Sequence, residues 1–408
     1  MERGKRPLPD VVLLQRIADT PNIPPQLLGL APRHTPCSPW VFTPHPSRTT
    51  TRVAPLPSFG EEGEDPVRRR NLLAAGLATA ATGTALGAGP ASAHPALASL
   101  EDLLLHRGGP GPGTEATAHT VSAALAASQR EFGTCRYETL ARALPGRIAL
   151  ARALGGQGGA EERSANAVAE LYNTATRLCI KLGEDGLAAV TADRALTAAL
   201  AGADALTVAE AHRMVSSSWR RQGHHARAAD VAASAAQQLA ADRTAPVAAC
   251  LSVQGNLYAT AAYTAAKQGD RHTAHVLIEE AAATAERLGQ DEQRAGTAFF
   301  GPSQVLLHRI SISQLLGDAG QAIDHARSVD AAALPTAERQ ARYWIDVARS
   351  FGQWGKPDRC YRALLAAEAA AAQEVRRGAV RVLAADLVRY DRRLPGVRAF
   401  AQRIGALA

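Results

Sequence analysis

One arrangement of apolar and polar positions recurs five times between residues 161 and 372. In each copy an amphipathic run rich in Ala and Leu ends at a glycine, and a small residue follows five positions later. A glycine at this place supplies the left-handed residue that commonly ends a helix. The pattern therefore predicts five helical hairpins. Their turn glycines are Gly183, Gly223, Gly269, Gly317 and Gly355, and the small residues after them are Ala188, Ala228, Ala274, Ala322 and Cys360.

Further small or β-branched residues keep fixed places around each glycine. Seven positions before it stand Thr176, Ser216, Ala262, Ile310 and Ala348, and twelve after it stand Ala195, Ala235, Ala281, Val329 and Ala367. Helix axes packed about 8 to 10 Å apart leave no room for large side chains at the contact. Successive glycines are 40, 46, 48 and 38 residues apart, and a repeated helical hairpin is typical of a stacked solenoid. We predict an all-α solenoid whose hairpins begin with helices at 162–182, 204–222, 246–268, 303–317 and 337–354.

The rest of the chain divides by composition. A helical pair is expected at 121–132 and 137–154, with Pro145 as a kink, and two Arg-rich helices after residue 374 give the solenoid a polar end. Prolines between 32 and 57 predict a disordered linker. We therefore divide the chain into four parts, a short helical segment at 1–30, a linker at 31–68, an Ala/Gly-rich tether at 69–115 and a helical repeat domain at 116–408.

Charge and candidate chemistry change this picture little. The net charge is +7, but the arginines are scattered among acidic residues, as on solvated helix faces. The five cysteines are far apart and form no CxxC pair, which favours a reducing compartment over disulfides or zinc. His272 and His275 lack a third ligand at a convincing spacing, and no nucleophile or phosphate-loop motif is present. We predict no catalytic residue, no cofactor, no metal and no enzyme activity.

One stretch leaves the localisation open. Arg69 and Arg70, followed by a mildly apolar run and Ala91-Ser92-Ala93, resemble a twin-arginine export signal with its cleavage site. Such signals lie at the extreme amino terminus, whereas about 67 residues precede this one, so a basic tether is the other interpretation. No apolar run reaches the roughly 18 residues of a membrane span. We expect a cytoplasmic protein without a membrane partner, and export is the alternative.

The first thirty residues resemble the closing part of an XRE-type helix-turn-helix domain. Residues 2–4 match the end of its recognition helix, 9–19 its fourth helix and 23–28 its fifth. In that family the two helices that grip DNA lie upstream of this point. Arg3, Lys5 and Arg6 could then contact DNA phosphates without reading sequence, and specific DNA binding requires an upstream extension that restores the domain. A degenerate regulator and a start codon placed too far downstream are both compatible with this pattern.

The hairpins resemble tetratricopeptide repeats (TPR), and the whole chain is similar to actinobacterial regulators that join an XRE-type domain to a TPR sensor region. The segments that carry this similarity are 68–76, 141–154, 297–330 and 364–389. The resemblance implies a transcriptional regulator whose groove, lined by the first helices, binds a peptide, a small molecule or a protein. A homodimer is left open, and the alternative function is a TPR scaffold or adaptor. The candidate groove residues are Arg213, Asn256, Tyr258, Gln304, His308 and Arg309.

Overall fold

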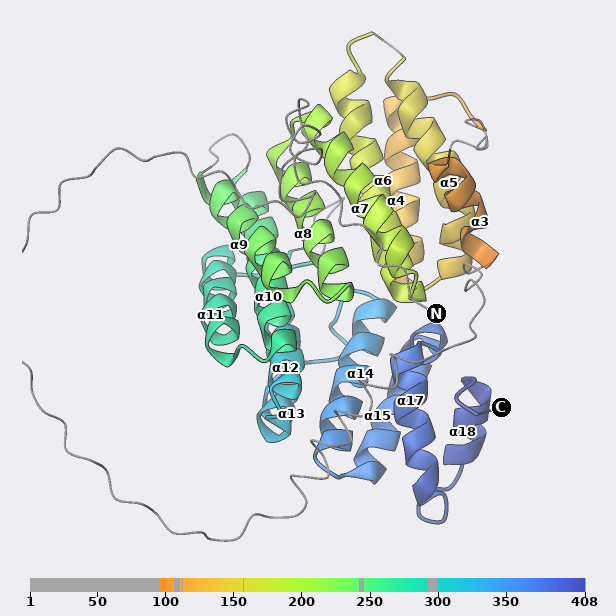
Figure 1. Cartoon of the computed structure of the whole chain (residues 1–408), viewed down its shortest axis with the longest axis vertical. Coiled ribbons are helices and arrows are strands. Elements are labelled where there is room, and N and C mark those ends of the chain that lie inside the picture. Colours follow the sequence, from red (N-terminus) through yellow and green to blue (C-terminus); the bar gives the residue numbers. More distant parts are fainter. Residues whose placement is uncertain are drawn as a thin grey trace, which may run out of the picture. The chain divides into compact units, whose positions relative to one another are not determined.

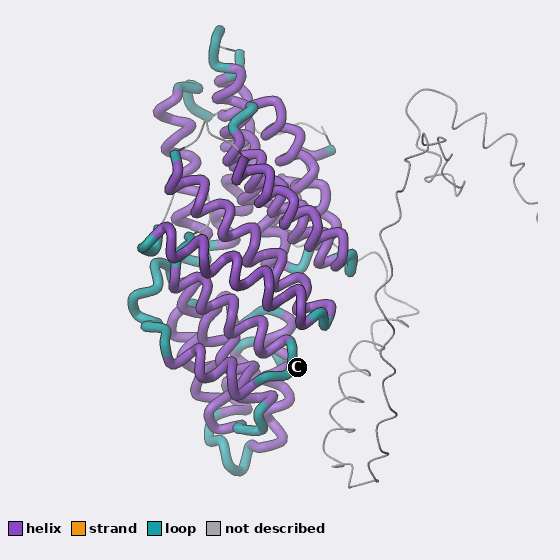
Figure 2. Tube along the Cα trace, turned by 90° about the vertical axis from the view of Figure 1, so that its left-hand side faces the viewer, coloured by secondary structure: helices purple, strands orange, loops and turns teal. Residues whose placement is uncertain are grey.

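The computed structural model describes residues 95–105, 111, 113–156, 158–241, 246–292 and 299–407. All of them belong to one compact unit. Apart from an isolated bridge between Glu292 and Phe300, the regular structure of these residues is helical, and Figure 2 shows the helices joined by short loops. The predicted all-α helical solenoid is confirmed. The segments predicted as helix-turn-helix remnant (1–30) and linker (31–68), and most of the predicted tether, lie outside the described residues.

Helices follow one another along the whole described chain (Figure 1). Their order is η2 (Pro95–Leu97), α3 (Ala98–Leu104), α4 (Ala118–Gly133), α5 (Tyr137–Leu154), α6 (Glu161–Leu182), α7 (Asp185–Gly202), α8 (Ala205–Arg221), α9 (His225–Ala241), α10 (Val247–Gln268), α11 (Arg271–Leu288), α12 (Pro302–Leu315), α13 (Ala319–Arg327), α14 (Ala337–Gln353), α15 (Pro357–Ala370), α16 (Ala372–Val375), α17 (Gly378–Leu387), η3 (Val388–Tyr390) and α18 (Val397–Arg403).

The five predicted hairpins are the pairs α6–α7, α8–α9, α10–α11, α12–α13 and α14–α15. The predicted first helices agree with the observed ones to within two residues at either end. Each turn glycine has a positive φ, between 69° at Gly355 and 91° at Gly317. An L side chain is strained in this region, so glycine is the residue that allows the tight reversal.

The small residues lie where the two helices of a hairpin touch. The residue five positions after each turn glycine is fully buried in all five hairpins. In the second hairpin Ser216 of α8 donates a hydrogen bond of 2.7 Å to the backbone oxygen of Ala228 in α9. A side chain can reach the backbone of the neighbouring helix only when the two helices pack closely. The residues twelve positions after each turn glycine are buried as well, except Val329. Helix α13 ends at Arg327, and Val329 lies half-buried beyond it.

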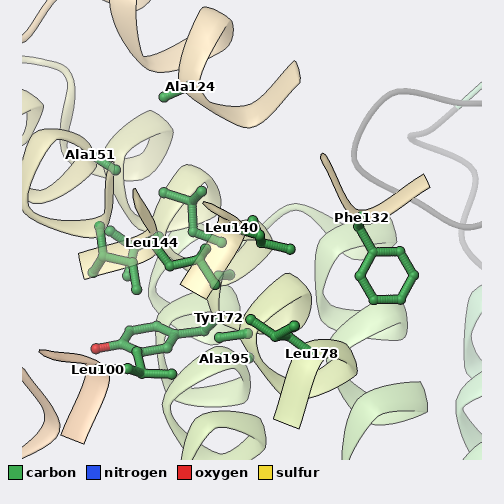
Figure 3. Close-up of a cluster of buried hydrophobic side chains, with 14 of the residues drawn as sticks. Leu100, Ala124, Phe132, Leu140, Leu144, Ala151, Tyr172, Leu178 and Ala195 are labelled. Carbon is green, nitrogen blue, oxygen red and sulfur yellow. The ribbon is translucent and has the colours of Figure 1, made fainter. Parts of the chain in front are cut away.

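The helical unit begins earlier than the predicted boundary at residue 116. Helix η2 and α3 pack on α5, and their buried side chains are Leu97, Leu100, Leu103 and Leu104. Figure 3 shows Leu100 beside Tyr172 in this core, close to Leu140 and Leu144. The Ala/Gly-rich composition of 69–115 concealed the spacing of these leucines, which is that of an amphipathic helix.

The first helices of successive hairpins close into a ring. Helix α4 contacts α6, and contacts continue in turn through α8, α10, α12 and α14. Helix α14, the first helix of the last hairpin, then contacts α4, the helix with which the series begins. In Figure 1 the helices α14 and α17 accordingly lie next to the part of the molecule that holds α4–α7. The second helices α7, α9, α11, α13 and α15 each pack on the first helix of their own hairpin.

We predict that Gly183→Ala destabilises the protein whereas Gly186→Ala does not. Gly183 has a φ of 85°, where an L residue costs about 1 kcal/mol. Gly186 lies three residues later in the first turn of α7, and a Cβ there would meet nothing within 4 Å. Urea unfolding of both variants measures the difference. Equal losses of stability in the two variants would contradict a conformational role for the turn glycine.

Candidate functional site

A cavity of about 170 Å³ lies at the centre of the ring of first helices. Every helix of the ring contributes to its wall, and Arg377 is added by the short connection between α16 and α17. The lining residues are Phe132 from α4; Arg177, Ile180 and Lys181 from α6; Arg213, Met214, Ser217 and Arg220 from α8; Asn256, Thr260 and Tyr263 from α10; Gln304, Leu307, His308 and Ser311 from α12; and Glu338, Arg339, Arg342 and Asp346 from α14.

The spacing of these residues explains why they meet. On α6, Arg177 and Lys181 are four residues apart, and on α12 the same spacing separates Gln304 from His308. Residues three or four apart lie on one face of a helix. Each first helix therefore turns a single polar face towards the cavity, while its Ala- and Leu-rich faces pack against neighbouring helices.

Positive charge dominates the cavity wall. Two carboxylates, Glu338 and Asp346, line it. The seven cations that line it are Arg177, Lys181, Arg213, Arg220, Arg339, Arg342 and Arg377. Two further carboxylates, Glu210 and Glu374, form ion pairs with lining cations without lining the cavity themselves. Seven cations thus face four carboxylates, and the site carries an excess of three positive charges.

Four of the lining arginines have carboxylate partners, among them Arg339, which pairs with Glu338 at 3.5 Å. Arg213 pairs with Glu210 at 2.5 Å, Arg342 with Asp346 at 3.0 Å and Arg377 with Glu374 at 3.2 Å. Asp346 also accepts a hydrogen bond of 2.6 Å from Ser311. The charge of Asp346 raises the pKa of Arg342 above its usual value, against the opposing effect of burial. These side chains are therefore held in place within the wall.

Lys181 joins the two ends of the ring. Its ammonium group forms ion pairs with Glu338 of α14 and, at 2.8 Å, with Glu374 of α16. The Lys181 and Glu338 side chains are 8% and 6% exposed, and that of Glu374 is fully buried. The Tyr137 hydroxyl of α5 donates to Glu374 at 2.5 Å. Burial raises the pKa of Glu338, but the charges of Lys181 and Arg339 outweigh it and keep that carboxyl ionised.

Arg177 and Arg220 form no ion pair with a carboxylate among the described residues. The Arg177 guanidinium lies 4.7 Å from the centroid of the Phe132 ring and donates to the Thr174 hydroxyl at 3.2 Å. Arg220 lies 5.1 Å from the Tyr263 ring centroid and donates to the Thr264 hydroxyl at 3.1 Å. Burial lowers the pKa of each guanidinium to about 10, so both stay charged at neutral pH.

Neutral polar groups lie on α10 and α12. His308 Nδ1 lies 3.0 Å from the backbone oxygen of Gln304 and 3.2 Å from the side-chain nitrogen of the same residue. Burial lowers the pKa of His308 to about 3, and the positive charges of Arg339 and Arg342 act in the same direction. His308 is therefore neutral at physiological pH. Asn256 Nδ2 donates to the backbone oxygen of Phe299 at 3.3 Å.

The structure brings four of the six predicted groove residues together. Arg213, Asn256, Gln304 and His308 line the cavity, whereas Tyr258 and Arg309 do not. Tyr258 follows Asn256 by two residues, which turns it about 200° away, and it packs half-buried against the core.

Arg309 faces outwards from the ring as well. It pairs with Glu279 of α11 at 2.9 Å. The predicted phosphate contacts Arg3, Lys5 and Arg6 lie outside the described residues.

Of the seven cations that line the cavity, only Arg213 was among the predicted site residues. The lining cations on α6 and α14 stand at helical spacing within the predicted first helices, and this spacing could have indicated them.

The described part of the chain offers neither a metal site nor a membrane span. It holds no group of three or more His, Cys, Asp or Glu side chains placed to bind a metal, and His272 and His275 are exposed on α11. Its helices include none with the length and apolar character needed to cross a membrane.

Comparison of the chain with family models, with curated proteins and with solved structures finds no match. The cavity is therefore interpreted from its own chemistry.

We expect Lys181→Met to lower the free energy of unfolding by about 3 kcal/mol, because it leaves Glu338 and Glu374 as adjacent buried carboxylates. Adding Glu338→Gln and Glu374→Gln to the same chain should restore most of this loss. The control is Arg142→Gln, which breaks an exposed pair with Glu138 at 3.5 Å and should cost at most about 1 kcal/mol. Urea unfolding at pH 7 measures all three. An equal cost for Lys181→Met and Arg142→Gln would contradict a structural role for the buried pair.

We also expect His308 to make stability depend on pH. Its pKa is about 3 in the folded chain against 6.5 for the unperturbed group, so between these values the unfolded state binds the additional proton. Stability then falls as the pH drops below about 6.5. His308→Gln should remove roughly 1 to 2 kcal/mol of the loss between pH 7 and pH 5, measured as the difference between the two proteins in urea unfolding. Parallel pH profiles for the two proteins would refute this assignment.

Proposed function

We propose that this chain is a cytoplasmic regulatory protein whose helical ring binds a ligand in its central cavity. The observation that carries the proposal is the composition of the wall, to which all six helices of the ring contribute side chains. A ligand held there contacts every hairpin from α6 to α14 together with α4. Its binding energy can therefore act on the packing of the whole ring, as the input domain of a regulator requires.

The closure of the ring narrows the class of ligand. A groove open along one side would accept an extended peptide or a partner helix. Here α14 contacts α4, and the cavity between the first helices measures about 170 Å³. A helix is about 10 Å in diameter with its side chains and does not fit into such a volume. Among a peptide, a small molecule and a protein, the cavity fits a small molecule best.

The resemblance to XRE-type regulators with TPR sensor regions suggests what ligand binding would control. In such a protein, ligand binding in the helical ring alters how a helix-turn-helix domain meets DNA. The competing function is an exported TPR scaffold. It is favoured by the position of Ala91-Ser92-Ala93, because cleavage after Ala93 would leave every described helix intact.

Chromatin immunoprecipitation in the native host tests the regulator proposal. The protein, tagged at its chromosomal locus so that any upstream extension of the reading frame is kept, is compared with Ser217→Phe, which places a ring in the cavity, and with Arg309→Gln, which changes an outward-facing arginine. We expect discrete genomic sites for the wild type and Arg309→Gln, and altered occupancy at those sites for Ser217→Phe. If Ser217→Phe fails to fold, Gln304→Leu repeats the test. It replaces a polar side chain of the cavity wall by an apolar one of similar volume.

Two outcomes would overturn this function. Uniform background DNA in every sample, with a mature protein that begins at His94 outside the cytoplasm by mass spectrometry, would favour the scaffold. Discrete sites that neither cavity variant alters would show that the cavity is not the regulatory input.

A further inference from the structure

We propose that the cavity ligand is a small anion bearing phosphate groups, with two or more negative charges. The inference rests on the proposed function, since it takes the cavity as the ligand site, and it adds the chemistry of that ligand. It is carried by two half-buried arginines without carboxylate partners, Arg177 and Arg220, which line the cavity from adjacent helices.

These two arginines are held where an anion would satisfy them. Each rests on an aromatic ring and donates to one threonine hydroxyl, which fixes its direction and leaves most of its five donors for another partner. Arg177 Nε is buried and has no hydrogen-bond acceptor among the described residues. Buried polar groups in proteins are nearly always hydrogen-bonded, so Arg177 is less completely satisfied than the lining arginines that pair with carboxylates.

A third arginine connects them. Arg213 lies on α8 two turns before Arg220, which corresponds to about 10 Å along the helix. Besides the larger effect of burial, the charge of Arg213 lowers the pKa of both Arg177 and Arg220. The three guanidinium groups are thus close enough to repel one another, and a ligand with a single charge would leave much of this repulsion in place.

The size of the cavity favours phosphate over carboxylate groups. An excess of three positive charges has to be met within about 170 Å³. A phosphate monoester carries about 1.5 to 2 negative charges at pH 7 on three oxygens, whereas a carboxylate carries one charge on two. Six of the seven lining cations are arginines, whose planar donors match phosphate oxygens in bidentate geometry.

The opposite wall recognises a neutral part of the ligand. Gln304 is 2% exposed, lines the cavity, and its Oε1 atom accepts no hydrogen bond from the described residues. Because His308 is neutral, this wall adds no further positive charge. This wall therefore suits an uncharged polar part of the ligand, on the side away from its phosphates.

A second, positively charged cavity lies beside the first. It measures about 610 Å³ and shares Ile180, Lys181 and Arg377 with the central cavity. Its wall adds Arg221, Arg376 and Arg381, against one lining carboxylate, Glu138. A positive potential beside the central cavity raises the local concentration of an anion and its rate of association.

Pyrophosphate is the probe that tests the proposal on the full chain. Isothermal titration calorimetry and thermal unfolding at fixed ionic strength compare it with inorganic phosphate and citrate. We expect pyrophosphate to bind and raise Tm, and citrate to bind far more weakly. Arg177→Gln and Arg220→Gln should each weaken pyrophosphate binding roughly tenfold to a hundredfold, while Arg309→Gln, with an outward-facing arginine on the same ring, should bind like the wild type.

The Tm of each variant without ligand shows whether the substitution impairs ligand binding or folding. Since Arg177 and Arg220 have no carboxylate partner, their Gln variants lose only the contact with an aromatic ring and one threonine hydroxyl, and without anion their Tm should fall by only a few degrees. A large loss of Tm in both would assign these residues to the fold and overturn the proposal. Equal binding of citrate and pyrophosphate would also overturn it. If every anion fails to bind while a neutral compound binds in a manner that Ser217→Phe abolishes, the anion proposal is wrong and the proposed function stands.

Discussion

The buried contact of Lys181 with Glu338 and Glu374 is the constraint on which the rest of the structure depends. These ion pairs span 157 and 193 residues of sequence, and they fasten α6 to α14 and α16. Stacked hairpins need contact only with their neighbours, so it is such contacts between the two ends of the series that distinguish this closed ring from an open solenoid. The wall around the cavity forms because α14, the first helix of the last hairpin, contacts α4 at the start of the series.

Alanine makes the ring narrow enough to close around a small space. Helix pairs that meet at Ala, Ser or Thr approach closely, as the hydrogen bond from Ser216 to the backbone of Ala228 shows. Larger residues at those contacts would move the helices apart and widen the ring. The inner faces of the first helices carry the arginines, which line the cavity together with apolar residues such as Met214 and Leu307.

The local structure was predictable from sequence, whereas closure of the ring was not. Each turn glycine and its small residues define a hairpin from within about forty residues of sequence. The bounds of the first helices could therefore be predicted to within two residues. Helical periodicity alone would have separated Asn256 from Tyr258 and His308 from Arg309, since members of each pair point to different faces. Nothing local to Arg177 indicates that Arg339 of α14 faces it, because that proximity arises only when helices distant in sequence meet.

The charge imbalance of the cavity is best understood together with closure. A protein selected for stability alone would pair Arg177 and Arg220 with carboxylates, as it pairs Lys181 with two. Instead, repulsion among the guanidinium groups opposes the contacts that hold the ring shut. An anion in the cavity removes that repulsion and adds bonds to several helices at once, so the ring and the ligand stabilise each other. Ligand binding and ring closure are therefore coupled by electrostatics, and a change in one is transmitted to the other without any moving hinge.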